Sequence, residues 1–269
     1  MSAPAPVLRS PPPAAPAAPR LRLGRLTIDP VTFPEALARI EALVAARQGG
    51  SVFTPNVDHV VNVDADAHFA EAYAQVSLSL VDGTPLLWAS RALGAPLPEK
   101  ISGSDLVWPL MQRAAERGWR VYLLGAGPGV AQEAAERFER ELGLKVVGVD
   151  SPRIAARPGA VDESAEALAR LRAAAPDLVL VAFGSPKQEL WIHAHAAQLA
   201  PAVAVAVGAS LDFVAGRVKR APAWMSRAGL EWLYRLGQEP RRLWRRYLVN
   251  DPKFVGILLR TLRESRRAR

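Results

Sequence analysis

Short apolar runs alternate along this chain with longer stretches whose apolar positions recur at helical spacing. The runs 120–124 and 202–207, for example, are rich in valine, leucine and alanine, and each stops at a glycine. Such runs are typical of parallel strands buried on both faces, so the pattern predicts an α/β fold, a Rossmann-like parallel sheet covered by helices. The predicted strands are 21–27 (an edge strand), 51–54, 78–81, 120–124, 145–149, 177–182 and 202–207, and the predicted helices are 32–46, 58–74, one with Pro85 in its first turn, 130–142, 164–174 and 188–199.

The pattern changes after Gly216, where prolines begin to punctuate the chain. Pro222, Pro240 and Pro252 each stand where a helix could start, since proline is well tolerated in a first helical turn. Three parts are therefore expected. They are a disordered Pro/Ala-rich tail (1–20), an α/β catalytic domain (21–216) and a C-terminal helical basic appendage (217–269).

The last predicted helix is amphipathic and basic, and two placements suit it. Its apolar stripe could lie on an anionic membrane surface, or it could pack back on the domain. No run of the chain reaches the roughly 18 uninterrupted apolar residues of a membrane span. The stripe consists of Phe254, Ile257, Leu258 and Leu262, and its basic neighbours are Lys253, Arg260 and Arg263.

The positive charge of the chain is local. The 269 residues carry a formal net charge of +8, but residues 217–269 alone hold 15 Lys or Arg against 4 Asp or Glu. The remainder is therefore slightly acidic. A local basic segment rich in tryptophan and tyrosine indicates an anionic partner, which could be a nucleotide phosphate, a phospholipid headgroup or a nucleic acid.

Composition argues against a metal site built from soft ligands. The chain contains no cysteine, and its four histidines show no ligand spacing. Asp64 and Asp66 match the DxD pattern of metal-dependent nucleotide-sugar enzymes, but residues two apart on a helix point to nearly opposite sides. No metal is therefore expected, and arginine or lysine would have to neutralise phosphate charge.

Polar or glycine-rich clusters follow several predicted strands. Ligands of parallel α/β sheets bind beyond the carboxyl ends of the strands, so these clusters are the candidate site. They are Thr54-Pro55-Asn56, Asp82-Gly83-Thr84, the glycine-rich loop 125–129, the segment 184–189 and the segment 208–212.

The loop that contains Gly125 and Gly127 precedes a helix, so its amides could hold a phosphate or a ribose. It resembles a dinucleotide fingerprint, with Asp150 as the acidic residue, but Val130 replaces the third glycine. A tight strand–helix turn would need the same glycines for its backbone alone.

Single polar residues at the strand ends also allow two interpretations. Asp82 could be a general base, or it could be a turn or cap residue. Gln188 or Lys187 could hydrogen-bond a sugar or a base, whereas Glu189 suits the first turn of a helix, where it would act as a cap.

Taken together, five segments in this order resemble the WecG/TagA/CpsF family of bacterial glycosyltransferases. The resemblance covers about residues 51–247, and the ordered set is far more specific than any one segment. The segments are TPNVDHVVNVDAD, LVDGTPLLWASRALGAPLPEKISGSDL, VYLLGAGPGVAQEAAERF, PDLVLVAFGSPKQELWI and GASLDFVAGRVKRAPAWMSRAGLEWLYRLGQEPRRLWRRY.

The resemblance implies an inverting glycosyltransferase that needs no metal or other cofactor. Such enzymes move a sugar, often N-acetylmannosamine or its uronic acid, from a UDP-sugar donor to a polyprenyl-diphosphate-linked acceptor. It also implies a peripheral protein at the cytoplasmic face of the membrane, which the C-terminal helices contact, and a possible homo-oligomer. No nucleic-acid partner is expected. Glucose also stays open as the donor sugar.

The resemblance also assigns residues. Asp82, beside Gly83, matches the proposed catalytic base, and Thr54 and Asn56 match the TPN active-site motif. Arginines of the appendage match proposed contacts to the UDP diphosphate, and the best matches are Arg235, Arg242 and Arg245. Arg241 and Arg246 are equally good candidates for the places of Arg242 and Arg245. The implied substrate-binding residues are Gly83, Lys100, Gly125, Gly127, Gln188, Arg235, Arg242 and Arg245.

Two other classes of protein stay open at this point. One is a nucleotide-dependent oxidoreductase built on the Gly125 loop. The other is a non-enzymatic module that binds membrane or nucleic acid through its basic, aromatic C-terminal segment. The first would have to explain the basic C-terminal segment and the missing third glycine, and the second would not need five polar strand ends.

Overall fold

The apolar runs form the centre of the protein in a computed structural model that describes residues 19–155, 162–222, 224–225 and 229–267, apart from the side chain of Arg242. A six-stranded parallel sheet has the strand order β4-β3-β8-β7-β5-β6. The predicted α/β class is thus confirmed. The strands are β3 (Gly50–Phe53), β4 (Leu78–Ser79), β5 (Val121–Gly125), β6 (Val146–Asp150), β7 (Leu178–Ala182) and β8 (Val203–Ala206).

Alternate side chains of each strand enter two separate cores, one on each face of the sheet. Val179 and Val181 of β7 point to one core, and Leu178 and Leu180 point to the other. The central strands β7 and β8 are apolar and buried throughout because helices cover both faces. One face carries α1 (Phe33–Ala46), α5 (Gly103–Arg117), α6 (Val130–Leu142) and α10 (Ser210–Val214); the other carries α2 (Val57–Ala65), α3 (Ala67–Ala74), α4 (Thr84–Ala92), α7 (Ser164–Ala174), α8 (Lys187–Ala194) and α9 (Ala196–Leu199).

Three predicted elements were wrong in detail. The edge strand 21–27 is an antiparallel hairpin of β1 (Leu21–Leu23) and β2 (Leu26–Ile28), which turns at Gly24 with φ of 61°. The helix 58–74 is broken because the Asp66 side chain accepts hydrogen bonds from the backbone of His68 and Phe69 and so starts α3. The helix 188–199 is likewise two helices, α8 and α9.

Helix α5 is absent from the predicted elements although it contributes several buried residues to one core. It begins at Ser102, whose hydroxyl accepts a hydrogen bond from the backbone of Asp105, and it contains Pro109 in its interior. Leu106, Leu110 and other apolar side chains of α5 are fully buried. Its apolar positions do recur at helical spacing, but Pro109 is a residue that normally interrupts a helix, and this hides the element in the sequence.

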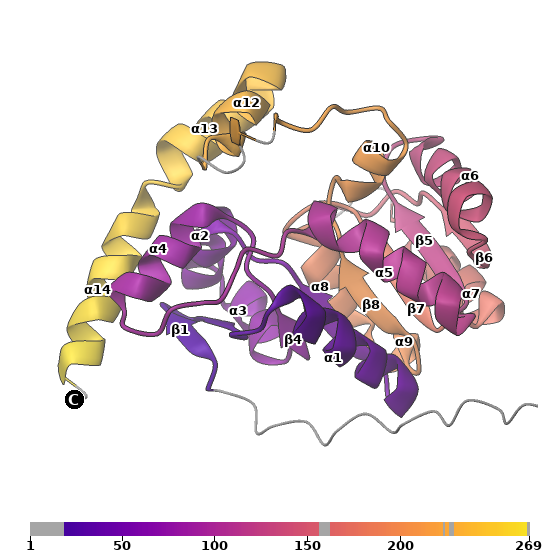
Figure 1. Cartoon of the computed structure of the whole chain (residues 1–269), viewed down its shortest axis with the longest axis horizontal. Coiled ribbons are helices and arrows are strands. Elements are labelled where there is room, and N and C mark those ends of the chain that lie inside the picture. The colour runs from indigo at the N-terminus through magenta and orange to yellow at the C-terminus, as the bar shows by residue number, and fades with distance from the viewer. Residues whose placement is uncertain (1–18, 156–161, 223, 226–228, 268–269) are drawn as a thin grey trace, which may run out of the picture.

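The C-terminal helices lie along one side of the molecule (Figure 1). They are α12 (Glu231–Gln238), α13 (Pro240–Arg245), the π-helical turn η1 (Arg246–Asn250) and α14 (Lys253–Arg267). Helix α14 packs against α2 and β1, where the backbone N–H of Gly24 donates to Thr261 Oγ1 at 2.9 Å. Whether residues 217–269 form a separate part, with the predicted boundaries, stays a prediction.

The apolar stripe of α14 faces the domain. Phe254 and Ile257 are buried, and Leu258 and Leu262 pack against the same core. Of the two placements open for this stripe, the structure takes the one against the domain. Across the described ranges, no helix has both the length and the apolar character that crossing a membrane requires.

Candidate active site

A cavity of about 310 Å³ opens where β3 and β4 end. Parallel pairing of Val52 with Leu78 and of Phe53 with Ser79 brings the two carboxyl ends to the same edge of the sheet. The C-terminal helices form the other wall, so both parts of the chain build the site. Its polar lining residues are Asn56, Asp82, Thr84, Lys100, Glu231, Arg235, Arg246, Tyr247 and Asp251.

Asp82 lies in this cavity and is held there by its backbone. Its N–H donates to Pro55 O at 2.8 Å, and the preceding Val81 carbonyl accepts from Ile101 at 2.7 Å. Gly83 follows with φ of 119°, a conformation that only glycine adopts without strain. The loop therefore fixes the carboxylate at the end of β4.

The pKa of Asp82 is raised from 3.8 to about 6, chiefly by burial and next by the nearby carboxylate of Glu231, while Arg235, Lys100 and His59 oppose the shift. A carboxylate with this pKa is ionised at neutral pH and still accepts a proton readily. Asp251, in the same cavity, also has a pKa of about 6, chiefly because of burial.

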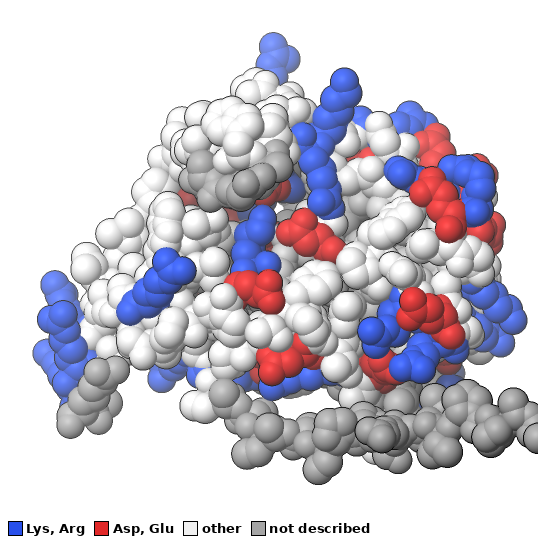
Figure 2. Space-filling view, in the orientation of Figure 1, with Lys and Arg blue, Asp and Glu red and all other residues white. Residues whose placement is uncertain are grey.

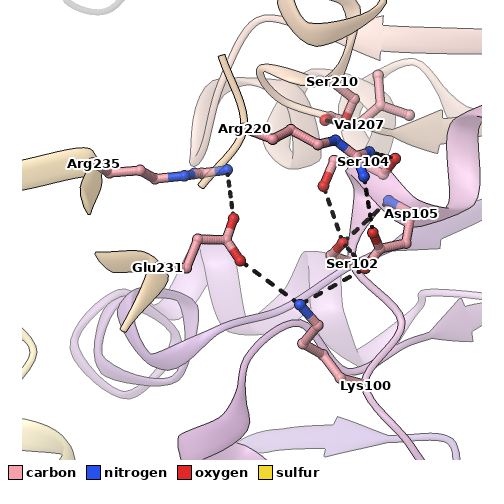
Figure 3. Close-up of polar contacts among 9 residues, drawn as sticks. All are labelled: Lys100, Ser102, Ser104, Asp105, Val207, Ser210, Arg220, Glu231 and Arg235. Atoms are coloured by element: carbon pink, nitrogen blue, oxygen red, sulfur yellow. Dashed lines mark hydrogen bonds and ion pairs between the residues drawn. The ribbon is translucent and has the colours of Figure 1, made fainter. Parts of the chain in front are cut away.

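Three charged groups of the cavity lining, Lys100, Glu231 and Arg235, meet in one cluster (Figure 3). Lys100 Nζ lies 3.7 Å from Glu231 Oε2, and Arg235 Nη2 lies 3.3 Å from Glu231 Oε1. Lys100 Nζ is also 3.7 Å from Asp105 Oδ2. The guanidinium of Arg235 is 5.6 Å from the centre of the Phe213 ring, which limits where it can point.

Arg246 joins the appendage to the end of β3. Its Nη2 donates to Asn56 Oδ1 at 3.0 Å, and its Nε is 3.5 Å from Asp58 Oδ2. Its guanidinium lies 5.5 Å from the Tyr247 ring, and burial is the main reason that the pKa of the Tyr247 hydroxyl is raised. A second fixed cation thus lies in the cavity wall.

A buried hydrogen-bonded chain runs from the cavity to the far strand ends. His59 Nδ1 lies 2.8 Å from Asn56 Oδ1, and His59 Nε2 lies 3.3 Å from Glu189 Oε1. Gln188 Nε2 donates to the same Glu189 oxygen at 2.8 Å, and Gln188 Oε1 accepts from Gly208 N at 3.1 Å. This chain holds Asn56 in place from behind.

Comparison with known proteins identifies the family. The profile of the glycosyl transferase WecG/TagA/CpsF family matches residues 21–268. An N-acetylglucosaminyldiphosphoundecaprenol N-acetyl-beta-D-mannosaminyltransferase of Bacillus spizizenii is 34% identical over 219 residues, 81% of this chain and 82% of that protein. A protein of the same name from Bacillus subtilis is 30% identical over 213 residues, 79% of this chain and 80% of that protein. The chain belongs to the WecG/TagA/CpsF glycosyltransferase family.

The predicted site residues of this glycosyltransferase separate into two groups. The structure brings Asp82, Gly83, Asn56, Lys100 and Arg235 together around the cavity. The others lie elsewhere: Thr54 is buried beside Gly103, Gln188 lies at the far end of the buried chain, Arg245 is exposed, and the side chain of Arg242 falls outside the described residues.

The Gly125 loop of this glycosyltransferase lies apart from the cavity. It ends β5, which β7 and β8 separate from β3 in the sheet. A Cβ atom on Gly125 would come within 2.8 Å of the Ala182 carbonyl carbon, so the backbone requires glycine there. Gly127 has no such close neighbour, and binding by this loop stays a prediction.

Several residues of the site were missed or left ambiguous in the sequence. Arg246 lines the cavity, whereas its neighbour Arg245 does not. Glu189 does lie in the first turn of α8, but its fully buried carboxylate bonds to Gln188 and His59 instead of serving only as a cap. Glu231 carries a local signal, since a glutamate four residues before Arg235 predicts a pair on one helix face.

The two aspartates of the DxD pattern do not converge. Asp64 pairs with Arg260 of α14, and Asp66 caps α3. Within the described ranges, the structure contains no group of three or more histidine, aspartate or glutamate side chains that could hold a metal ion.

Proposed function

We propose that this glycosyltransferase transfers N-acetylmannosamine from a UDP donor to N-acetylglucosamine linked to undecaprenyl diphosphate, with inversion and without a metal ion. The names of the two Bacillus relatives support this donor and acceptor over glucose or a uronic acid. The observation that carries the proposal is one cavity that is lined both by Asp82, with a pKa of about 6, and by the cations Lys100, Arg235 and Arg246.

In the proposed reaction, the acceptor hydroxyl loses its proton to Asp82 as its oxygen attacks the anomeric carbon of the donor. The new C–O bond forms while the bond from that carbon to the diphosphate oxygen breaks on the opposite face. The electron pair of the broken bond leaves with UDP. Lys100, Arg235 and Arg246 lie where they could stabilise the added negative charge, which is the task a metal performs in other transferases.

The lipid-linked acceptor places the proposed reaction at the cytoplasmic membrane surface. Exposed apolar side chains of the C-terminal helices support a peripheral contact there, even though the stripe of α14 is buried. Over α12 and α13 the visible surface is mostly uncharged (Figure 2). The exposed side chains are Trp224, Trp232, Leu233, Trp244, Leu248, Val249, Val255 and Leu259. Homo-oligomer formation and the absence of a nucleic-acid partner stay predictions.

UDP release tests the proposal directly. Purified protein is incubated with a panel of UDP-sugars and an undecaprenyl-diphosphate-GlcNAc analogue in the presence of EDTA, and Asp82→Asn is assayed beside it. We expect acceptor-dependent turnover with UDP-N-acetylmannosamine that survives EDTA and is lost in the variant. Turnover only with another UDP-sugar would overturn the donor assignment. Loss of activity in EDTA, restored by a divalent ion, would overturn the metal-free mechanism.

A further inference from the structure

Glu231 is an unexpected residue in a cavity that has to hold a diphosphate. Its two carboxylate oxygens each face one cation, Lys100 at 3.7 Å and Arg235 at 3.3 Å (Figure 3). These are two of the cations to which the proposed function gives the donor diphosphate. A bound diphosphate and the Glu231 carboxylate would therefore compete for the same positive charges.

A second carboxylate in this cluster, that of Asp105, makes more hydrogen bonds and ion pairs than that of Glu231. Its Oδ2 accepts from Ser102 Oγ at 2.6 Å, its Oδ1 lies 3.2 Å from Arg220 Nη1, and its backbone N–H is also bonded to Ser102. It stands in the first turn of α5, where a negative charge is stabilised by the helix dipole. Asp105 is thus part of the frame that positions Lys100.

Glu231 is held differently. It lies in the first turn of α12, on the C-terminal side of the cavity, and its side chain is 31% exposed. Its carboxylate forms ion pairs with the two cations themselves, Lys100 and Arg235. A glutamate side chain with access to solvent can rotate away once a stronger anion occupies those cations, because water then replaces the lost ion pairs at little cost.

We propose that Glu231 is an internal counter-anion, which occupies the diphosphate position of the empty site and is displaced when the donor binds. The inference rests on the proposed function, because it takes Lys100 and Arg235 as diphosphate ligands. Glu231 prevents two close cations from repelling each other in the empty site. It also makes UDP binding depend on a ligand with enough negative charge to replace it.

The proposal predicts that removing the charge of Glu231 strengthens UDP binding. Glu231→Gln keeps the size of the side chain but no longer competes for Lys100 and Arg235. We expect UDP to bind about three- to tenfold more tightly by calorimetry at low salt, the range expected for one competing charge near a protein surface, with a smaller gain at high salt. Glu264→Gln removes the same charge from an exposed position on α14 and should leave UDP affinity unchanged.

A second variant links the gain to the named cation. Arg235→Gln removes one partner of Glu231, so the gain from Glu231→Gln should shrink when it is introduced into Arg235→Gln. A glutamate with a merely structural role would instead lower the melting temperature and weaken UDP binding in Glu231→Gln. That result, unchanged affinity, or an equal gain with and without Arg235 would each overturn the inference alone.

The pH dependence gives a readout that is independent of binding. Asp82 is faced by Glu231, Arg235, Lys100 and His59, and Glu231 is the one negative group among them. Its removal should move the acid limb of the kcat/KM profile, which reports the enzyme without bound donor, to lower pH. An unmoved limb would overturn the place given to Glu231 in the empty site. If the wild-type protein bound no UDP at all, the proposed function would fail, and the inference with it.

Discussion

The two parts that build the cavity differ in what holds them in place. The α/β part positions Asp82 and Asn56 by strand pairing, backbone hydrogen bonds and a buried polar chain, so its groups have little freedom. The C-terminal helices supply Arg235 and Arg246 through partly exposed ion pairs and ring contacts. Partly exposed ion pairs contribute less stability than buried hydrogen-bonded networks. The base Asp82 is therefore preorganised, whereas Arg235 and Arg246 are held by weaker contacts.

The largest effect expected is loss of the base. Asp82→Asn keeps the shape of the side chain but cannot accept a proton, so kcat should fall about 10²- to 10⁴-fold. In wild-type protein, activity should rise with pH around 6, because the carboxylate must be ionised to act. Both are measured by UDP release across pH.

Asp251→Asn is the matched control, because its carboxylate has a similar pKa in the same cavity. If Asp82 is the base, the acid limb stays near pH 6 in Asp251→Asn. A limb that disappears with Asp251 and not with Asp82 would assign the proton transfer to the C-terminal part.

Breaking the buried hydrogen-bonded chain behind Asn56 should lower the free energy of unfolding by nearly as much as loss of the base raises the activation barrier. His59→Ala removes the imidazole that faces the fully buried Glu189 carboxylate, so that charge loses one of its two side-chain partners. We expect unfolding to become easier by about 3–5 kcal/mol, as measured by denaturant titration. Glu189→Gln in the same background should recover part of the loss, and no recovery would mean that the charge is not the cause.

Removing a cation should affect catalysis more than stability. Arg246→Gln deletes the guanidinium that contacts Asn56 and lines the cavity, and kcat/KM should fall about 10²- to 10³-fold. Arg241→Gln, at an exposed position on α13, is the control and should change kcat/KM little. Equal losses in both variants would point to a general charge effect of the appendage.

The smallest effect expected is a gain in stability. The pKa of Asp82 is higher in the folded protein, so folding favours its protonated form, and this contribution is lost as pH rises through about 6. Asp82→Asn should therefore be more stable than wild type by about 1–3 kcal/mol at pH 8, and the difference should vanish below pH 4. Denaturant titrations at the two pH values measure it, and a pH-independent difference would refute the linkage.

The sequence determined the α/β core because its central strands are apolar runs and the apolar positions of its helices recur at helical spacing. Both features are local along the chain. The end of β4 with Asp82 and the end of β3 with Asn56 could be predicted for the same reason, since each follows a recognisable strand. The ordered motifs further determined the family, and the match over residues 21–268 confirms it. Helix α5 was missed although its apolar positions keep helical spacing, because Pro109 in its interior normally marks the end of a helix.

Only the tertiary structure decided that Arg246 and not Arg245 lines the cavity, because the two lie where α13 passes into the π-helical turn η1, whose rotation no sequence pattern gives. It also decided that α14 turns its apolar stripe to the domain, and that Glu231 faces the same cations as a diphosphate would. These outcomes depend on how helices dock across long stretches of chain. Docking is fixed by many weak contacts that compete, whereas strand and helix formation follow from the spacing of apolar residues along the chain.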